Sequence, residues 1–336
     1  MNAGNSPTTL GVLGFGRWGK VLVDSVQGRS ETVRFVAAAA RDPDRVAAEA
    51  ARRELRVAPD LAALLADDAI DGIVLATPHS LHGEQIEACI KAGRPVLVEK
   101  PFTLTRASAA SVLDLAREYN VLVAAAHNRR FLAPVVSLKH MMSEGALGIV
   151  LHIETHFSSN VVGRYPTNSW RVAEGESPAG GLAGSGIHQI DALIHLDSLI
   201  TEVFAWTSRR IPELPIDDKT TAMFKLASGA TASLITITAT AATYRIEVFG
   251  SKAKAELTGD AGVRGSETLE VTNVDGSRER FDFPPLDIER AELEAFGAAI
   301  RGEAPYPVAP EEVLNGIAAF EAVSDSASSG LPIVLR

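Results

Sequence analysis

Three glycines near the N-terminus limit the possible folds of this chain more than any other feature. They belong to a run that reads GxGxxG: Gly14, Phe15, Gly16, Arg17, Trp18 and Gly19. The run follows the apolar residues 10–13 and precedes a helical pattern at 17–26. Between a strand and a helix, such glycines allow a tight turn, the approach of a pyrophosphate and close helix–strand packing. The run therefore predicts a dinucleotide-binding loop, although ordinary glycine-rich turns and nucleoside-binding methyltransferases share the pattern.

The first 125 residues alternate short apolar runs with helical patterns. The apolar runs predict strands at 10–13, 35–40, 71–76, 95–98 and 121–126. Helices are expected at 17–26, 81–92 and 106–119, and Asp42 is predicted to cap a further helix that begins at Pro43. Such alternation is typical of βαβ units in a parallel sheet with both faces covered. We therefore predict an α/β protein whose N-terminal domain, residues 1–125, is a doubly wound, NAD(P)-binding Rossmann sheet.

The second half of the chain has a different pattern. Polar and apolar residues alternate at 149–157, 220–226, 230–238, 245–249 and 269–274, and two helical segments follow near 287–300 and 311–328. Successive strands of this kind indicate an antiparallel sheet with one covered face. We predict a C-terminal α+β domain, residues 126–336, with a large, mostly antiparallel open sheet that binds substrate and mediates oligomerisation.

One strand of the expected open sheet is more apolar than a solvent-exposed face requires. Residues 232–237 (ASLITI) are apolar at most positions, whereas a strand with one wet face alternates more cleanly. An open face of this kind is often buried against a symmetry-related copy. A homodimer or homotetramer is therefore expected.

Charge and hydropathy exclude several classes of partner. The chain has 32 Lys and Arg against 42 Asp and Glu, a net charge of −10, and no basic run. Such a chain is a poor candidate for nucleic acid, and without an apolar stretch of about 18–20 residues no membrane span is expected. The N-terminus lacks a secretory signal pattern, and Cys89 is the single cysteine, which excludes an intrachain disulfide. A cytoplasmic protein is expected.

The residues after the second predicted strand bear on the choice between NADP and NAD. About 20 residues beyond the glycines, an NAD site offers an acid to the ribose, but this chain has Ala40 and Arg41 there. Arginine binds a 2′-phosphate through paired hydrogen bonds, whereas an acid repels it. NADP is therefore the preferred cofactor, and NAD stays possible because Asp42 follows directly.

Five further segments follow the glycine run in an order that resembles a known family. They are 76–82 (ATPHSLH), 99–101 (EKP), 127–131 (HNRRF), 170–171 (WR) and 180–191. With the glycine run, they resemble the Gfo/Idh/MocA family of glucose–fructose oxidoreductases and inositol dehydrogenases over nearly the whole chain. The resemblance implies NAD(P)-dependent oxidation or reduction of a sugar, a polyol or a related diol.

The resemblance also implies roles for single residues. Lys100 matches the family's catalytic lysine, and His188 matches its catalytic histidine. Substrate contacts are implied for these two residues and for Arg129, and Asp191 holds either the substrate or the local structure. Cofactor contacts are expected for the glycine run and for Arg41, Thr77, Pro78, Glu99, Pro101, Trp170 and Arg171.

One position departs from the family pattern. An acid usually stands four residues before the histidine, where this chain has Gly184. Such an acid would orient the imidazole and raise its pKa. Without it, His188 is either a weaker base or a hydrogen-bond donor.

Three functions stay open at this point. The first is an oxidoreductase that moves a hydride between nicotinamide and a secondary alcohol or hemiacetal carbon, with Lys100 and His188 taking or relaying the proton. The second is a non-catalytic NAD(P)-binding sensor or scaffold, which Gly184 favours. The third is an enzyme that eliminates or hydrolyses without net redox change.

No metal site is expected, because His152 and His156 would lie about 13 Å apart on a strand.

Overall fold

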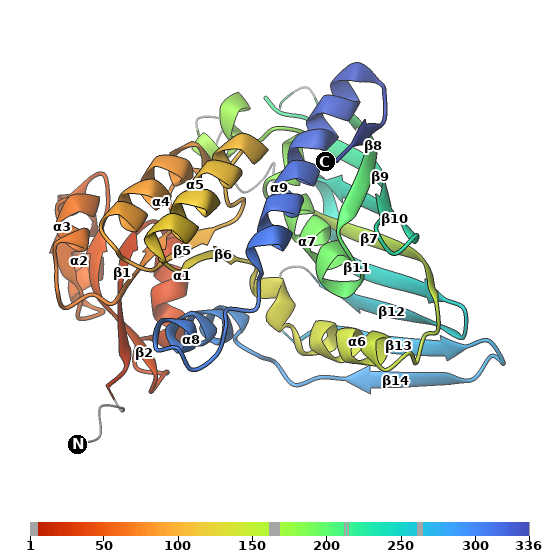
Figure 1. Ribbon diagram of the computed structural model, residues 1–336, viewed down its shortest axis with the longest axis horizontal. Helices are drawn as coiled ribbons and strands as arrows, with labels where there is room; N and C mark the ends of the chain where they lie inside the picture. Colours follow the sequence, from red (N-terminus) through yellow and green to blue (C-terminus); the bar gives the residue numbers. More distant parts are fainter. Residues whose placement is uncertain (1–5, 161–168, 212, 214, 261–264, 336) are drawn as a thin grey trace. The chain divides into compact units, whose positions relative to one another are not determined.

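The chain forms two compact units in the computed structural model, which describes residues 6–160, 169–211, 213, 215–260 and 265–335 (Figure 1). Unit 1 consists of Met1–Thr103, Ala107–Asn128 and Asp287–Val313. Unit 2 consists of Leu104–Arg106, Arg129–Leu286 and Leu314–Arg336. The chain therefore returns to unit 1 after it has formed most of unit 2.

Unit 1 is built around a six-stranded parallel sheet with the order β3-β2-β1-β4-β5-β6. The strands are β1 (Thr8–Leu13), β2 (Val33–Ala39), β3 (Arg56–Ala58), β4 (Gly72–Leu75), β5 (Val96–Glu99) and β6 (Val123–Ala126). Its helices are α1 (Arg17–Val26), α2 (Pro43–Ala51), α3 (Leu61–Leu65), α4 (His82–Lys91), α5 (Arg106–Tyr119) and α8 (Ile288–Ile300). This strand order is that of a doubly wound sheet, so the predicted Rossmann fold is confirmed.

The sequence explains the buried strands and one helix start of unit 1. All four residues of β4 and all four of β5 are buried, as parallel strands with two covered faces require. At the start of α2, the Asp42 side chain accepts a hydrogen bond from the backbone N of Arg45 at 3.2 Å, and Pro43 is the first helical residue. The predicted cap is therefore confirmed.

Unit 2 contains a nine-stranded sheet with the order β14-β13-β12-β11-β7-β10-β9-β8-β15. The strands are β7 (Val150–Asn160), β8 (Ile200–Ser208), β9 (Lys219–Leu226), β10 (Thr231–Ile237), β11 (Ala239–Gly250), β12 (Ala253–Gly259), β13 (Thr268–Asn273), β14 (Arg278–Asp282) and β15 (Ile333–Val334). Strands β10 and β7 pair in parallel, and the other described pairs are antiparallel. The predicted, mostly antiparallel sheet is confirmed.

Four strands of unit 2 were not predicted from the sequence. One of them, β15, has only two residues, and the other three were missed for different physical reasons. In β8 the register shifts between Ile200 and Glu202, which interrupts the alternation of apolar residues. In β12 the buried positions include small alanines, which give a weak apolar signal. Strand β14 is largely exposed and charged, and it pairs with β13.

Helices of unit 2 pack against one face of the sheet. Helix α7 (Gly186–Leu196) contacts β7 and β10, and α6 (Ala133–Ser143) contacts β12 and β13. Helix α9 (Pro310–Ser329) is joined to β8, because Ser326 Oγ accepts a hydrogen bond from the backbone N of Ala205 at 3.0 Å. Figure 1 shows these three helices beside the strands they contact.

No helix in the described ranges is both long and apolar enough to span a membrane.

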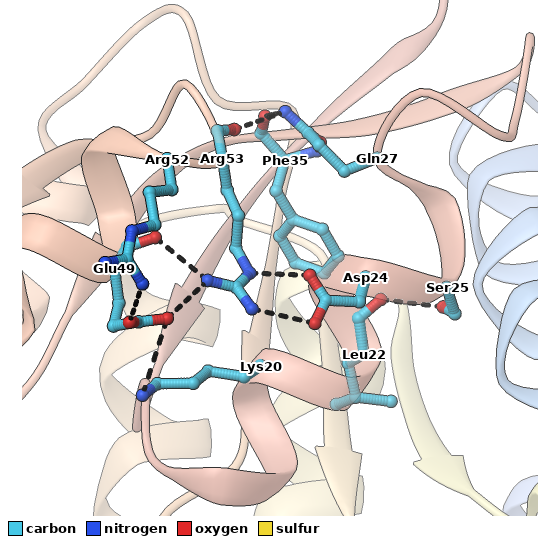
Figure 2. Close-up of polar contacts among 9 residues, drawn as sticks. All are labelled: Lys20, Leu22, Asp24, Ser25, Gln27, Phe35, Glu49, Arg52 and Arg53. Atoms are coloured by element: carbon cyan, nitrogen blue, oxygen red, sulfur yellow. Dashed lines mark hydrogen bonds and ion pairs between the residues drawn. The ribbon is translucent and has the colours of Figure 1, made fainter.

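Arg53 links α1 and α2 within unit 1 (Figure 2). Its guanidinium donates two hydrogen bonds to Asp24 of α1, at 2.5 and 2.8 Å, and one to Glu49 of α2 at 2.8 Å. The same group lies 5.9 Å from the centre of the buried Phe15 ring. The hydrogen bond from Arg53 is the main cause of the lowered pKa of Asp24.

We expect Arg53→Met to lower Tm by about 2–4 °C at pH 7, because the substitution keeps the aliphatic stem but removes these hydrogen bonds. Asp24 has its pKa held below the ordinary 3.8, so its contribution is complete above that pH and is lost as the pH falls through the lowered pKa. The difference in Tm should therefore shrink near pH 3, as followed by circular dichroism. Arg52→Met, which removes one bond from a more exposed arginine, is the control. Equal Tm values for Arg53→Met and the parent at pH 7 would contradict the role of Arg53.

Candidate active site

The three glycines of the glycine run differ in the space around them: Gly14 and Gly16 lie between β1 and α1, and Gly19 lies in the first turn of α1. Gly14 has φ of +96°, and a Cβ there would lie 2.5 Å from the carbonyl oxygen of Ala76. A Cβ on Gly19 would lie 2.4 Å from the carbonyl oxygen of Gly14. A Cβ on Gly16 would meet no described atom within 4 Å, and Gly16, as the N-cap residue of α1, makes no side-chain cap. The open space at an uncapped helix start fits the pyrophosphate of a dinucleotide.

The two charged residues that follow β2 have different surroundings. Arg41 is exposed, whereas the carboxylate of Asp42 caps α2. The carboxylate of Asp42 is therefore used by its own helix, and Arg41 is the exposed charged side chain beside it.

Glu99, Lys100 and Pro101 lie at the carboxyl end of β5, between the ends of β4 and β6. Trp18 of the glycine run donates from Nε1 to Glu99 Oε1 at 2.5 Å. Burial raises the pKa of Glu99, while Lys100 and the bond from Trp18 act in the opposite direction. The glycine run and the lysine segment are therefore joined through a buried carboxyl group.

His82 connects two segments to which the sequence assigned cofactor contacts. Its ring is completely buried, with Nδ1 2.9 Å from the carbonyl oxygen of Pro101 and Nε2 3.2 Å from that of Thr77. The Thr77 hydroxyl donates to Gln85 Oε1 at 2.5 Å. His82 belongs to the segment 76–82 used for the family resemblance, but no pattern in the sequence indicated this bridging position.

A group of buried polar residues near Glu99 was also missed. Glu289 and Glu292 of α8 are 6% and 1% exposed. Asn128 donates to Glu289 at 3.4 Å, and the charge of Glu289 contributes to the raised pKa of Glu99. The detectable signal was a pair of acids, three residues apart, on the apolar face of a helix.

In unit 2, the carboxylate of Asp191 is engaged by a neighbouring arginine. Arg130 donates from Nε at 3.1 and 3.0 Å and from Nη2 at 2.7 Å, and both side chains are at most 7% exposed. A buried ion pair with this geometry fixes both partners. The arrangement favours a structural role for Asp191 over the substrate contact implied by the resemblance.

His188 lies on the same helix, α7, and is buried beside Phe157, with ring centres 5.9 Å apart. Gly184, which stands at the position of the missing acid, is exposed and lacks a positive φ. A Cβ there would meet only the carbonyl oxygen of Gly181, at 3.9 Å. The backbone at position 184 therefore accepts a side chain.

The remaining predicted residues of unit 2 form two ring contacts. The Arg129 guanidinium lies 5.2 Å from the centre of Phe157 and 5.1 Å from that of Tyr244. The Arg171 guanidinium lies 4.2 Å from the Trp170 ring, in a short 3-10 helix, Trp170–Val172. The predicted site residues thus form one set in unit 1, which includes Lys100, and a second set in unit 2.

Within the described ranges, no three His, Cys, Asp or Glu side chains could hold a metal ion.

Family models match both units of the chain. A model described as "Oxidoreductase family, NAD-binding Rossmann fold" matches residues 8–127, and "GFO/IDH/MocA C-terminal domain" matches residues 135–256. The two ranges cover most of the described strands and helices, and they confirm the family that the sequence resembles.

Relatives and solved structures agree with these models. An uncharacterised oxidoreductase, C115.03, of Schizosaccharomyces pombe is 33% identical over 174 residues, which are 51% of this chain and 46% of that protein. D-xylose 1-dehydrogenase (NADP(+)) 2 of Haloferax volcanii is 28% identical over 330 residues, 97% and 98% of the two chains. The chain therefore spans about half of the first relative and nearly all of the second. The crystal structure of a putative NADPH-dependent oxidoreductase from Desulfitobacterium hafniense has a TM-score of 0.91 and 25% identity, covering 98% of this chain and 97% of that one.

We expect Glu99→Gln to flatten the pH dependence of stability, since glutamine keeps an oxygen that accepts from Trp18 but does not ionise. Folding raises the pKa of Glu99 above its ordinary 4.5, so ionisation lowers the parent's free energy of unfolding as the pH rises above 4.5. The variant should therefore gain stability relative to the parent between pH 5 and pH 8 in urea unfolding. Glu118→Gln, on the exposed face of α5, is the control. Parallel pH profiles for the parent and Glu99→Gln would count against a buried carboxyl group at this position.

Proposed function

Since the chain belongs to the Gfo/Idh/MocA oxidoreductase family, we propose that it transfers a hydride between NAD(P) and a secondary alcohol or hemiacetal carbon of a sugar, polyol or related diol. The observation that supports this proposal most is the arrangement at the carboxyl edge of the parallel sheet. There Lys100 follows β5 beside a glycine loop with room for a pyrophosphate, and His82 and Trp18 tie the surrounding segments together. Ligands of doubly wound sheets bind at this edge.

The proposed reaction needs a proton acceptor beside the reacting alcohol. Bound nicotinamide supplies the hydride acceptor or donor. When the alcohol is oxidised, its C–H electron pair leaves as hydride, its O–H proton passes to a base, and a C=O bond forms. We assign the proton to Lys100 and His188, with Lys100 as the main group because position 184 is a glycine.

A second candidate is a non-catalytic NAD(P)-binding sensor or scaffold, and Gly184 is the observation that favours it. The two functions differ in one measurement. A panel of sugars and polyols with NADP+ and NAD+, followed at 340 nm, shows turnover for the oxidoreductase and cofactor binding without turnover for the sensor. An enzyme without net redox change would consume substrate at constant absorbance.

We assign NADP as the preferred cofactor on the strength of Arg41. If Arg41 contacts the 2′-phosphate, Arg41→Ala should weaken NADPH binding about 10–100-fold and leave NADH binding nearly unchanged. Fluorescence titration of the two cofactors measures both affinities. Equal losses for NADPH and NADH would remove Arg41 from the phosphate site.

The catalytic assignment predicts an order of effects. Lys100→Ala should lower kcat about 10²–10⁴-fold with cofactor affinity close to that of the parent. His188→Ala should cost less. Gly184→Asp, which the backbone tolerates, should raise the pKa of His188 by charge attraction and move the pH–rate profile upward. A near-normal kcat for Lys100→Ala on a verified substrate would make the lysine structural.

We also propose that the uncovered face of the nine-stranded sheet is buried in a homodimer or homotetramer. This face carries Phe204, Trp206, Met223, Ile235 and Ile237 on three adjacent strands, with Trp206 54% and Met223 42% exposed. Some of its charged side chains pair within the chain, as Arg245 does with Glu154 at 2.9 Å. An exposed apolar surface of this kind suits self-association.

Trp206→Glu should convert the oligomer to a monomer, because a charge then replaces an exposed ring at the proposed interface. Multi-angle light scattering distinguishes the two states. A parent protein that elutes at 35.5 kDa at micromolar concentration would contradict the assembly.

A further inference from the structure

Two adjacent arginines of unit 2 have different electrostatic surroundings. The charge of Arg130 is neutralised by Asp191. For Arg129, which is only partly buried, the described residues provide two aromatic rings and no carboxylate within ion-pair distance. The guanidinium of Arg130 is therefore used by Asp191, whereas no carboxylate of the described residues pairs with the guanidinium of Arg129.

The rings hold Arg129 in a defined position. Phe157 of β7 and Tyr244 of β11 are paired across the strands, and their rings form an edge-to-face contact at 5.3 Å. Both are buried, at 7% and 2% exposure, so the guanidinium rests against fixed surfaces. Stacking on aromatic rings orients a guanidinium without using its N–H groups. The planar set of N–H donors can then form paired hydrogen bonds with a carboxylate or phosphate.

This position is next to a residue of the proposed reaction. The Phe157 ring that contacts Arg129 also contacts His188. A ligand group bound to Arg129 would thus belong to the same substrate molecule with which His188 exchanges a proton.

The other charged groups near this point do not cancel the charge of Arg129. Asp191 is paired with Arg130, and Glu267 accepts a hydrogen bond from the backbone N of Gly265 at 3.1 Å. Burial, helped by Glu267 and Asp191, raises the pKa of Tyr244 to about 12, so this phenol stays neutral. Position 184, where the family has an acid, adds no negative charge.

We propose that Arg129 recognises an anionic group, a carboxylate or a phosphate, on the sugar or polyol substrate. The inference rests on the proposed function and narrows it to acidic substrates. A neutral sugar would leave the guanidinium uncompensated when it displaces water, whereas an anion gains paired, charge-assisted hydrogen bonds. A local cation is also needed because the chain as a whole, at −10, repels anions.

The test compares matched substrates in four proteins. The full-length parent, Arg129→Gln, Arg129→Lys and Arg117→Gln are assayed at 340 nm with D-glucose, D-glucuronate, D-gluconate and D-glucose 6-phosphate, with NADP+ and NAD+. Arg117→Gln removes the same charge from an exposed position on α5. Calorimetric titration of glucuronate and of inorganic phosphate into each protein, saturated with NADP+, measures binding without turnover.

The inference expects the parent to prefer at least one anion over glucose. Arg129→Gln should lower kcat/KM for that anion about 10–100-fold, chiefly through KM, and leave glucose nearly unchanged. Arg129→Lys should recover part of the loss, because it keeps the charge without the planar set of donors. Arg117→Gln should match the parent. Activity with glucuronate or gluconate identifies the anion as a carboxylate, and activity with glucose 6-phosphate identifies a phosphate.

Two results would overturn the inference while leaving the oxidoreductase intact. One is equal use of glucose and all three anions by the parent. The other is an equal loss for Arg129→Gln and Arg117→Gln. Absence of turnover with every compound counts against the proposed function, and calorimetry then decides the anion site alone. Binding of either anion to the parent that is lost in Arg129→Gln supports the site, and equal or absent binding in both rejects it.

Discussion

The close approach of Gly14 to the end of β4 is the constraint on which unit 1 depends. With a side chain at that position, the carbonyl of Ala76 would lie inside its van der Waals radius, and the ends of β1 and β4 would separate. The Thr77 segment, His82 and the lysine segment are all positioned from this edge of the sheet. A glycine that is required for backbone packing thereby also sets the spacing of the proposed cofactor and proton-transfer groups.

Local patterns in the sequence predicted much of this architecture. The glycine run, the apolar strands of unit 1 and the Asp42 cap each depend on residues within about one turn or strand, so their signal lies in short windows. Contacts between distant residues have no such signal. Trp18 and Glu99 are 81 residues apart, and Asn128 and Glu289 are 161 apart. The chain's return to unit 1 at residue 287 is likewise invisible to periodicity, because α8 looks like any amphipathic helix.

Within the candidate site, the resemblance supplied residue identities, and the structure supplied their partners. The sequence placed Arg129 and Asp191 together as substrate contacts. In the structure the two side chains have different partners, because Asp191 is bound to Arg130 and Arg129 lies against two aromatic rings. Which of two adjacent arginines is neutralised depends on the direction of each side chain in three dimensions, and neighbouring letters in a sequence do not encode it.

The discontinuous make-up of unit 1 has a consequence for how the protein is made. Helix α8 joins the first strands through Arg301, which donates to Thr8 at 2.6 Å, and through Gly297, where a Cβ would lie 2.6 Å from Val33. Residues 129–286 of unit 2 are synthesised before α8 exists. At a translation rate of about 5–20 residues per second, synthesis of residues 129–286 takes on the order of 10 s. During this time the surface of the first sheet that α8 later covers is exposed. Unit 1, although it holds the first strands, is therefore not complete until residues 287–313 have emerged.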